Sequence, residues 1–140
     1  MSAASCPQCG AELKCERAGE GATMRYRGVD VPVPAQVVVP TCGRCRCAFL
    51  DDATRRQLEP ILRAGYQQVL RERVRVAIDA LMGHISQRSL ERLLGLSQGY
   101  LSRLRSGAGN PSPELVSHLA LIANDPPGRL GELQRFWGVV

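Results

Sequence analysis

The chain has 140 residues, of which 44% are hydrophobic, so it can form one ordinary domain or two very small ones, and disorder throughout is excluded. Aromatic residues make up only 4%, so any core must be aliphatic, which suits short helices better than a β-sandwich. Lys and Arg number 18 against 13 Asp and Glu, and all but Lys14 are Arg, which favours an anionic partner because Arg makes forked contacts with phosphate and guanine.

The first element along the chain is a cysteine-rich segment, residues 1–50. It holds all six cysteines, namely Cys6, Cys9, Cys15, Cys42, Cys45 and Cys47. The sequence shows no signal peptide and no apolar run long enough to span a bilayer, so we expect a cytoplasmic protein without membrane association. In a reducing compartment, clustered cysteines are more often metal ligands than disulfides.

Four of these cysteines form two Cys-x-x-Cys pairs. In each pair, Cys6 with Cys9 and Cys42 with Cys45, the two intervening residues let both thiolates point at one ion. Four thiolates make a closed tetrahedral site, so the sequence predicts one structural Zn²⁺ ion held by Cys6, Cys9, Cys42 and Cys45.

The remaining two cysteines leave an alternative open. Cys47 competes with Cys45 as a ligand, although the two-residue spacing from Cys42 favours Cys45. Cys15 and Cys47 are then spare thiols, either buried near the site or able to release zinc on oxidation, and we favour the first reading.

Short, irregular strands are expected between the two cysteine pairs. The β-branched run from Val29 to Val39 is interrupted by Pro32 and Pro34. The 32 residues between the pairs exceed the about 15 to 20 of a compact zinc ribbon. We therefore expect residues 24–39 to form a hairpin that returns the second pair to the first.

A helical region begins near residue 51. Apolar residues at positions 70, 74, 78 and 81 share one helix face, while Pro60 and Gly65 are expected to break the segment into two helices. Further helices are predicted at residues 87–94, 97–105, 113–123 and 129–137. The sequence thus predicts an α+β protein: a small zinc-binding β domain (1–50), a helical linker (51–66) and an all-α, five-helix domain (67–140).

Residues 85–104 have the layout of a helix-turn-helix: a capped helix, a turn at Gly95 and a second capped helix. Residues 84–111 carry four Arg against Glu91 alone, a net charge of +3. Helical projection turns Leu101 and Leu104 inward and places Arg103 outward.

The outward residues of the second helix suit DNA. We expect Arg103 to bind guanine, Gln98 to bind adenine or order a neighbour, and Gly99 to let the helix sit deep in the major groove. Phosphate contacts are expected from Gln87, Arg88, Ser97, Tyr100, Ser102 and Arg105. The alternative is a helical bundle whose polar face is only solvated.

The combination of Cys6-Pro-Gln-Cys9-Gly10, Tyr26-Arg27-Gly28, Cys42-Gly-Arg-Cys45 and the motif from Ser86 to Gly107 resembles the MqsA-type antitoxins, which join a YgiT-type zinc finger to an XRE-type, Cro-like helix-turn-helix. The resemblance implies an N-terminal zinc domain able to bind a toxin and a C-terminal domain that dimerises and represses its own operon in the bacterial cytoplasm. By position it makes the four cysteines zinc ligands and Gln98, Gly99 and Arg103 base-reading residues. Glu91 stands where such motifs usually have a small residue.

Two functions follow as expectations. The first is a homodimeric repressor of a palindromic operator in double-stranded DNA, acting as the antitoxin of a type II toxin-antitoxin system. The second is a zinc-finger and helix-turn-helix adaptor in a mobile-element or phage-defence locus. The apolar tail, with Leu130, Leu133, Phe136 and Trp137, can form the dimer interface or pack on its own bundle. No enzyme is expected, because His84 and His118 lack a matching nucleophile and a four-cysteine zinc site has no open position.

Overall fold

The computed structural model describes residues 5–17, 21–45 and 52–139, which form two compact units, Met1–Tyr66 and Gln67–Val140. The first unit contains the four described strands, and the second contains most of the helical residues. The long helix α1 (Asp52–Leu81) contributes residues to both units. The predicted α+β fold class is confirmed.

Two antiparallel hairpins make up the strand part of the first unit. Strand β1 (Leu13–Arg17) pairs with β4 (Val38–Cys42), and β2 (Thr23–Tyr26) pairs with β3 (Val29–Pro32). In the β1–β4 register Leu13 lies opposite Cys42, which returns the second cysteine pair to the first. The prediction that one hairpin over residues 24–39 does this is wrong: the inner hairpin, formed by β2 and β3, ends at Pro32, and the outer pair of strands β1 and β4 brings the cysteine pairs together.

The turn between β2 and β3 is set by its two central residues. Arg27 has φ of 49° and Gly28 has φ of 79°, the pair of positive angles that a two-residue hairpin turn requires. Glycine adopts such an angle without strain, whereas arginine rarely does. The turn carries the Arg27 side chain back over the rings of Tyr26 and Tyr66, at 5.3 and 5.8 Å from their centroids.

The N-terminal half of α1 completes the core of the first unit. It buries Leu58, Leu62 and Tyr66, and the inner hairpin buries Val29 and Val31. A break at Pro60 or Gly65 was the expectation from sequence, and it is wrong, since α1 runs as one helix of 30 residues. Gly65 serves packing instead, because a Cβ atom there would collide with Val31.

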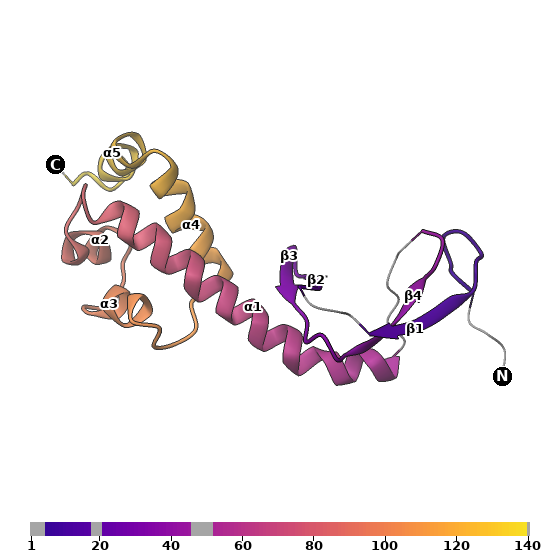
Figure 1. Cartoon of the computed structure of the whole chain (residues 1–140). Coiled ribbons are helices and arrows are strands. Elements are labelled where there is room, and N and C mark those ends of the chain that lie inside the picture. The colour runs from indigo at the N-terminus through magenta and orange to yellow at the C-terminus, as the bar shows by residue number, and fades with distance from the viewer. Residues whose placement is uncertain (1–4, 18–20, 46–51, 140) are drawn as a thin grey trace. The chain divides into compact units, whose positions relative to one another are not determined.

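The second unit is a five-helix bundle, counting the C-terminal half of α1. Helices α2 (Gln87–Leu93), α3 (Tyr100–Arg105), α4 (Pro113–Asn124) and α5 (Pro126–Trp137) gather around that half of α1 (Figure 1). The predicted apolar face of α1 is confirmed, because Leu70, Val74, Ile78 and Leu81 are all buried.

Side-chain caps start three of the short helices. Ser86 Oγ accepts from the backbone N–H of Ser89 at 3.2 Å, and Ser112 Oγ accepts from that of Leu115 at the same distance. Asp125 caps α5, which begins at Pro126 and not at residue 129 as expected. The two prolines fit there because the first turn of a helix needs no N–H donor.

Candidate functional site

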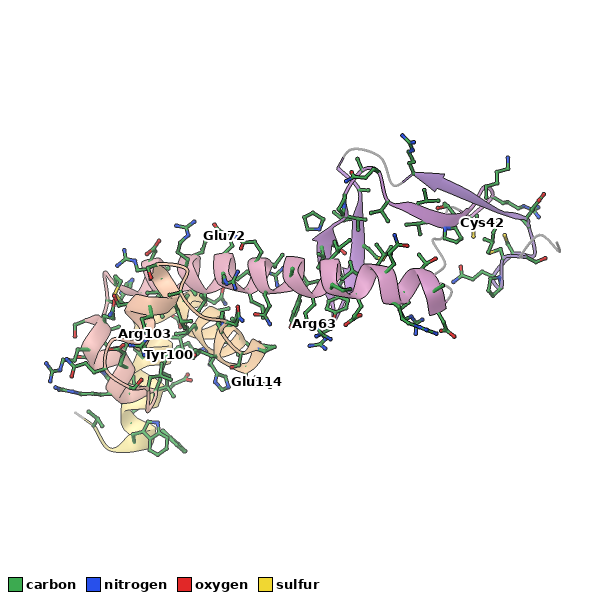
Figure 2. All side chains as sticks on the ribbon, turned by 90° about the horizontal axis from the view of Figure 1, so that it is seen from below. Cys42, Arg63, Glu72, Tyr100, Arg103 and Glu114 are labelled. Atoms are coloured by element: carbon green, nitrogen blue, oxygen red, sulfur yellow. The ribbon has the colours of Figure 1, made fainter. Side chains whose placement is uncertain are left out.

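The four cysteines of the two Cys-x-x-Cys pairs converge on one point. The Sγ atoms of Cys6, Cys9, Cys42 and Cys45 all lie within 4.8 Å of one another. The Cys6 and Cys45 sulfurs are 3.6 Å apart, and those of Cys9 and Cys42 are 3.4 Å apart. Yellow sulfur atoms therefore gather beside the label of Cys42 in Figure 2.

Backbone turns hold both pairs in place. Cys6 donates its N–H to Ala11 at 2.7 Å, and Gly10, at φ of 75°, donates its N–H to the Cys6 carbonyl at 2.8 Å. In the second pair, the N–H groups of Arg44 and Cys45 both donate to Cys42 Sγ at 3.4 Å. N–H donors aimed at a sulfur are the usual second layer of a thiolate metal site.

The same contacts shift the acidity of two thiols. The N–H groups of Cys45 and Arg44 favour the thiolate and lower the pKa of Cys42 to about 6. At Cys9 the Ala11 N–H also favours the thiolate, but the hydrogen bond with Cys42, burial and the other two thiols outweigh it and raise the pKa of Cys9 to about 12. Four thiols this close cannot all ionise without a cation among them.

The cluster fits a single tetrahedral ion. Bonds of about 2.3 Å from zinc to sulfur would place neighbouring sulfurs about 3.8 Å apart. Two of the observed spacings, 3.6 and 3.4 Å, are close to that value, all four sulfurs lie within 4.8 Å of one another, and each of the four residues offers one sulfur. An all-sulfur tetrahedron is typical of zinc or iron and leaves no open position for a substrate. The four cysteines can therefore hold a structural metal ion. Cys47 lies outside the described residues, so the structure does not test it as a ligand.

The second functional element is the pair α2 and α3 with the turn between them. Gly95 has φ of 69°, and Leu96 donates its N–H to the Glu91 carbonyl at 2.8 Å, which closes the turn. On α3, Leu101 and Leu104 are buried and Arg103 is exposed, as the helical projection predicts. The α3 surface that faces solvent is thus the one predicted to read bases.

The second helix starts later than expected. It begins at Tyr100, so Ser97 and Gln98 lie in the turn before it, and Gly99 forms the junction with φ of 82°. A left-handed residue cannot continue a helix, which accounts for the later start. Gln98 is exposed and Gly99 is half-buried.

Most residues predicted to contact phosphate are accessible. Arg88, Ser97, Ser102 and Arg105 are exposed, while Gln87 and Tyr100 are half-buried. Tyr100 and Arg103 lie side by side on α3 (Figure 2), with the Arg103 guanidinium 5.9 Å from the centroid of the Tyr100 ring. A cation–π contact at an exposed site contributes about 0.5 to 1 kcal/mol, so it favours this orientation of the Arg103 side chain.

Two acidic residues contact α3 in ways that the sequence did not predict. Glu91 Oε2 accepts from the backbone N–H of Leu101 at 3.0 Å, and Asp79 Oδ1 lies 2.6 Å from Arg105 Nε. Glu91 is buried on α2 directly after the buried Leu90. A charged residue next to an inward-facing leucine was the only feature of the sequence that pointed to a buried carboxylate. No local pattern links Asp79 to Arg105, which is 26 positions away.

The tail residues predicted at a dimer interface differ in exposure. Leu130 is buried in its own bundle, Leu133 is half-buried, and Phe136 and Trp137 are 75% and 62% exposed. Leu133 and Phe136 line a groove of about 540 Å³ between α4 and α5. The side chains of Phe136 and Trp137 therefore form an apolar surface that no other part of the described chain covers.

Comparison with known families identifies the second element. Residues 81–122 match the family model described as Helix-turn-helix (HTH_3), a segment that runs from the last residue of α1 into α4. This is an XRE-type helix-turn-helix domain. This match supports a DNA-binding regulator, so the prediction that the protein binds DNA is confirmed. The curated proteins contain no match to the chain.

Among the described residues, no helix has both the length and the apolar character needed to cross a membrane.

Proposed function

We propose that this protein is a sequence-specific transcriptional repressor that lays α3 in the major groove of its operator. The observation that supports this best is the exposed face of α3, where Arg103 is oriented by Tyr100 within a matched helix-turn-helix segment. Arg103 reads guanine, Gln98 and Gly99 lie at the leading end of the helix, and the surrounding Arg and Ser side chains bind phosphates. The protein acts by occupying DNA and not by catalysis.

The repressor is a homodimer in this proposal. Palindromic half-sites lie about 34 Å apart and demand two copies of the recognition helix. The exposed Phe136 and Trp137 and the adjoining α4–α5 groove supply the surface for the second copy. Replacement of both aromatic residues by Glu should yield monomers in size-exclusion chromatography with light scattering. Val76→Glu, at an exposed apolar position on α1, is the matched control and should remain dimeric.

The four-cysteine site holds Zn²⁺ in this proposal. The ion ties the two Cys-x-x-Cys turns together and thereby stabilises the first unit, whose core is small. Metal analysis of the protein as purified should give one zinc ion per chain, and iron in its place would contradict the assignment.

We also propose that the protein is the antitoxin of a type II toxin-antitoxin system. The support is the pairing of a separate four-cysteine unit with a DNA-binding unit, together with the resemblance described above. The first unit would bind the toxin while the second represses the operon. Coexpression with the neighbouring gene product, followed by copurification and a growth assay, tests this directly. A neighbour that neither binds the protein nor arrests growth alone overturns the antitoxin role and leaves DNA binding intact.

DNA binding itself is tested by fluorescence anisotropy with the upstream DNA and a scrambled duplex at two salt concentrations. We expect preference for the upstream DNA and a steep loss of affinity with salt, because phosphate contacts release counterions. Equal affinity for both duplexes would exclude a sequence-specific repressor.

A further inference from the structure

Among the described residues, Glu91 is the only charged side chain that is buried, with 3% of its surface exposed. It lies on α2, yet its hydrogen-bond partner is on α3, where Glu91 Oε2 accepts from the Leu101 N–H at 3.0 Å. Burial of a carboxylate is unfavourable unless it is hydrogen-bonded, so this contact offsets the cost of burying Glu91 between α2 and α3.

Helix α3 lacks the cap that its neighbours have. It has only six residues, and Gly99, at the N-cap position before Tyr100, has no side chain to accept from the first N–H groups. A helix this short is not stable by itself, and its first N–H groups need acceptors from elsewhere. The Glu91 carboxylate supplies one of them, and its negative charge also favours the N-terminal end of the helix dipole.

The other end of α3 is fixed by a second carboxylate. Arg105, its last residue, pairs with Asp79 of α1 at 2.6 Å. The helix is therefore held between two acidic side chains from two different helices, one buried and one at the surface. Arg103 lies between the two anchored positions, so a change in the tilt of α3 moves its guanidinium.

We propose that Glu91 is a positioning residue for DNA recognition, which replaces the missing N-cap of α3 and sets the angle at which Arg103 meets the bases. The proposal rests on the proposed function, since it explains how the same site achieves specificity. Phosphate contacts tolerate small shifts of a helix, whereas bidentate base contacts do not. Loss of the Glu91 contact should therefore reduce the preference for the operator more than the affinity for DNA in general.

Three variants separate these effects. Glu91→Leu removes the acceptor and keeps the volume, Glu91→Gln keeps an oxygen at the same reach, and Glu91→Asp keeps the charge but shortens the reach. Glu114→Gln is the control for charge, because Glu114 is exposed in the first turn of α4. For each, the exchange rate of the Leu101 amide is measured by NMR, and the affinities for upstream and scrambled DNA are measured by anisotropy.

We expect Glu91→Leu and Glu91→Asp to speed exchange of the Leu101 amide and lower the ratio of upstream to scrambled affinity by about tenfold, while scrambled affinity changes by less than about threefold. Glu91→Gln and Glu114→Gln should keep the ratio within about threefold. If Glu91→Leu does not fold, Glu91→Asp decides.

Two results would overturn the proposal: an unchanged Leu101 amide in both Leu and Asp variants, or faster exchange with an unchanged affinity ratio. If the wild-type protein shows no preference between the duplexes, the proposed function fails, and the Leu101 exchange rates then report separately on whether Glu91 caps α3.

Discussion

Arg105 Nε lies 2.6 Å from Asp79 Oδ1, so the last residue of the recognition helix is bound to helix α1. The same carboxylate also lies 3.4 Å from Arg75 through its other oxygen. Arg105 was expected from sequence to bind phosphate, but here an acidic partner within the protein competes for its guanidinium. The pair is partly exposed, so it is expected to contribute only about 0 to 1 kcal/mol to folding.

We predict that Asp79→Asn strengthens DNA binding. The change removes a negative charge and frees Arg105 and Arg75 for phosphates. The slope of log affinity against log salt concentration should therefore become steeper by the equivalent of about one to two phosphate contacts. Anisotropy titrations at several salt concentrations measure this slope. Glu132→Gln removes an equivalent charge next to Arg129 on α5 and should leave the slope unchanged. Weaker binding by Asp79→Asn would show that the positioning of α3 by this pair outweighs the effect of freeing the two arginines for phosphates.

Arg103→Ala should abolish a base preference. We expect a loss of about 1 to 3 kcal/mol on the preferred operator and relaxed specificity at one base position. Arg135→Ala, at an exposed position on α5, controls for the loss of one positive charge. Binding to a set of single-base operator variants is the measurement. A uniform loss on all of them would assign Arg103 to a phosphate instead.

Local patterns in the sequence were sufficient for much of this architecture. Cysteine spacing identified the cluster, and apolar periodicity identified the buried faces of α1 and α3, because both depend on residues close in sequence. The caps Ser86 and Ser112 are local in the same sense, since each accepts from the N–H group three residues later.

The failures of sequence reasoning involve long-range packing. Gly65 looked like a helix breaker because its partner, Val31, is 34 positions earlier. The contacts of Glu91 with Leu101 and of Asp79 with Arg105 could not be predicted, since each joins two different helices. Tertiary contacts override local propensity at such positions, and one sequence does not reveal them.

Removal of the metal should unfold only the first unit. The strand part of the first unit buries few side chains apart from its valines and cysteines. We therefore expect chelation by EDTA to eliminate the NMR signals of the strands and to keep those of α2 to α5. Cys6→Ser with Cys42→Ser should behave like chelated protein. Cys47→Ser should retain one ion per chain if the four clustered cysteines are the ligands. Loss of the ion in that variant would reassign a ligand.

Gly65→Ala should destabilise the first unit, although alanine is the better helix former by about 1 kcal/mol. The added methyl group would meet the fully buried Val31, and overpacking of this kind costs roughly 1 to 3 kcal/mol. Gly83→Ala is the control, because Gly83 has open space around its Cβ position and no positive φ. Denaturant unfolding of the metal-loaded protein should show a lower midpoint for the first variant only. An equal or higher midpoint would mean that the hairpin can move away from α1 at little cost.

Tyr26→Phe should change the acidity of Glu59. The Tyr26 hydroxyl donates to Glu59 Oε1 at 2.7 Å, and that bond, followed by Arg63, holds the pKa of Glu59 below its usual value of 4.5. A carboxyl whose pKa is lowered by folding stabilises the fold above its unfolded pKa, and that contribution is lost as the pH falls through the folded pKa. In the Phe variant the pKa of Glu59 should rise toward 4.5. The carboxyl carbon signal of Glu59 in an NMR titration of the metal-loaded protein measures this change. Arg63→Gln should raise the same pKa by a smaller amount, because its contribution ranks below that of the tyrosine. The reverse order of the two variants would show that charge, and not the tyrosine hydrogen bond, controls Glu59.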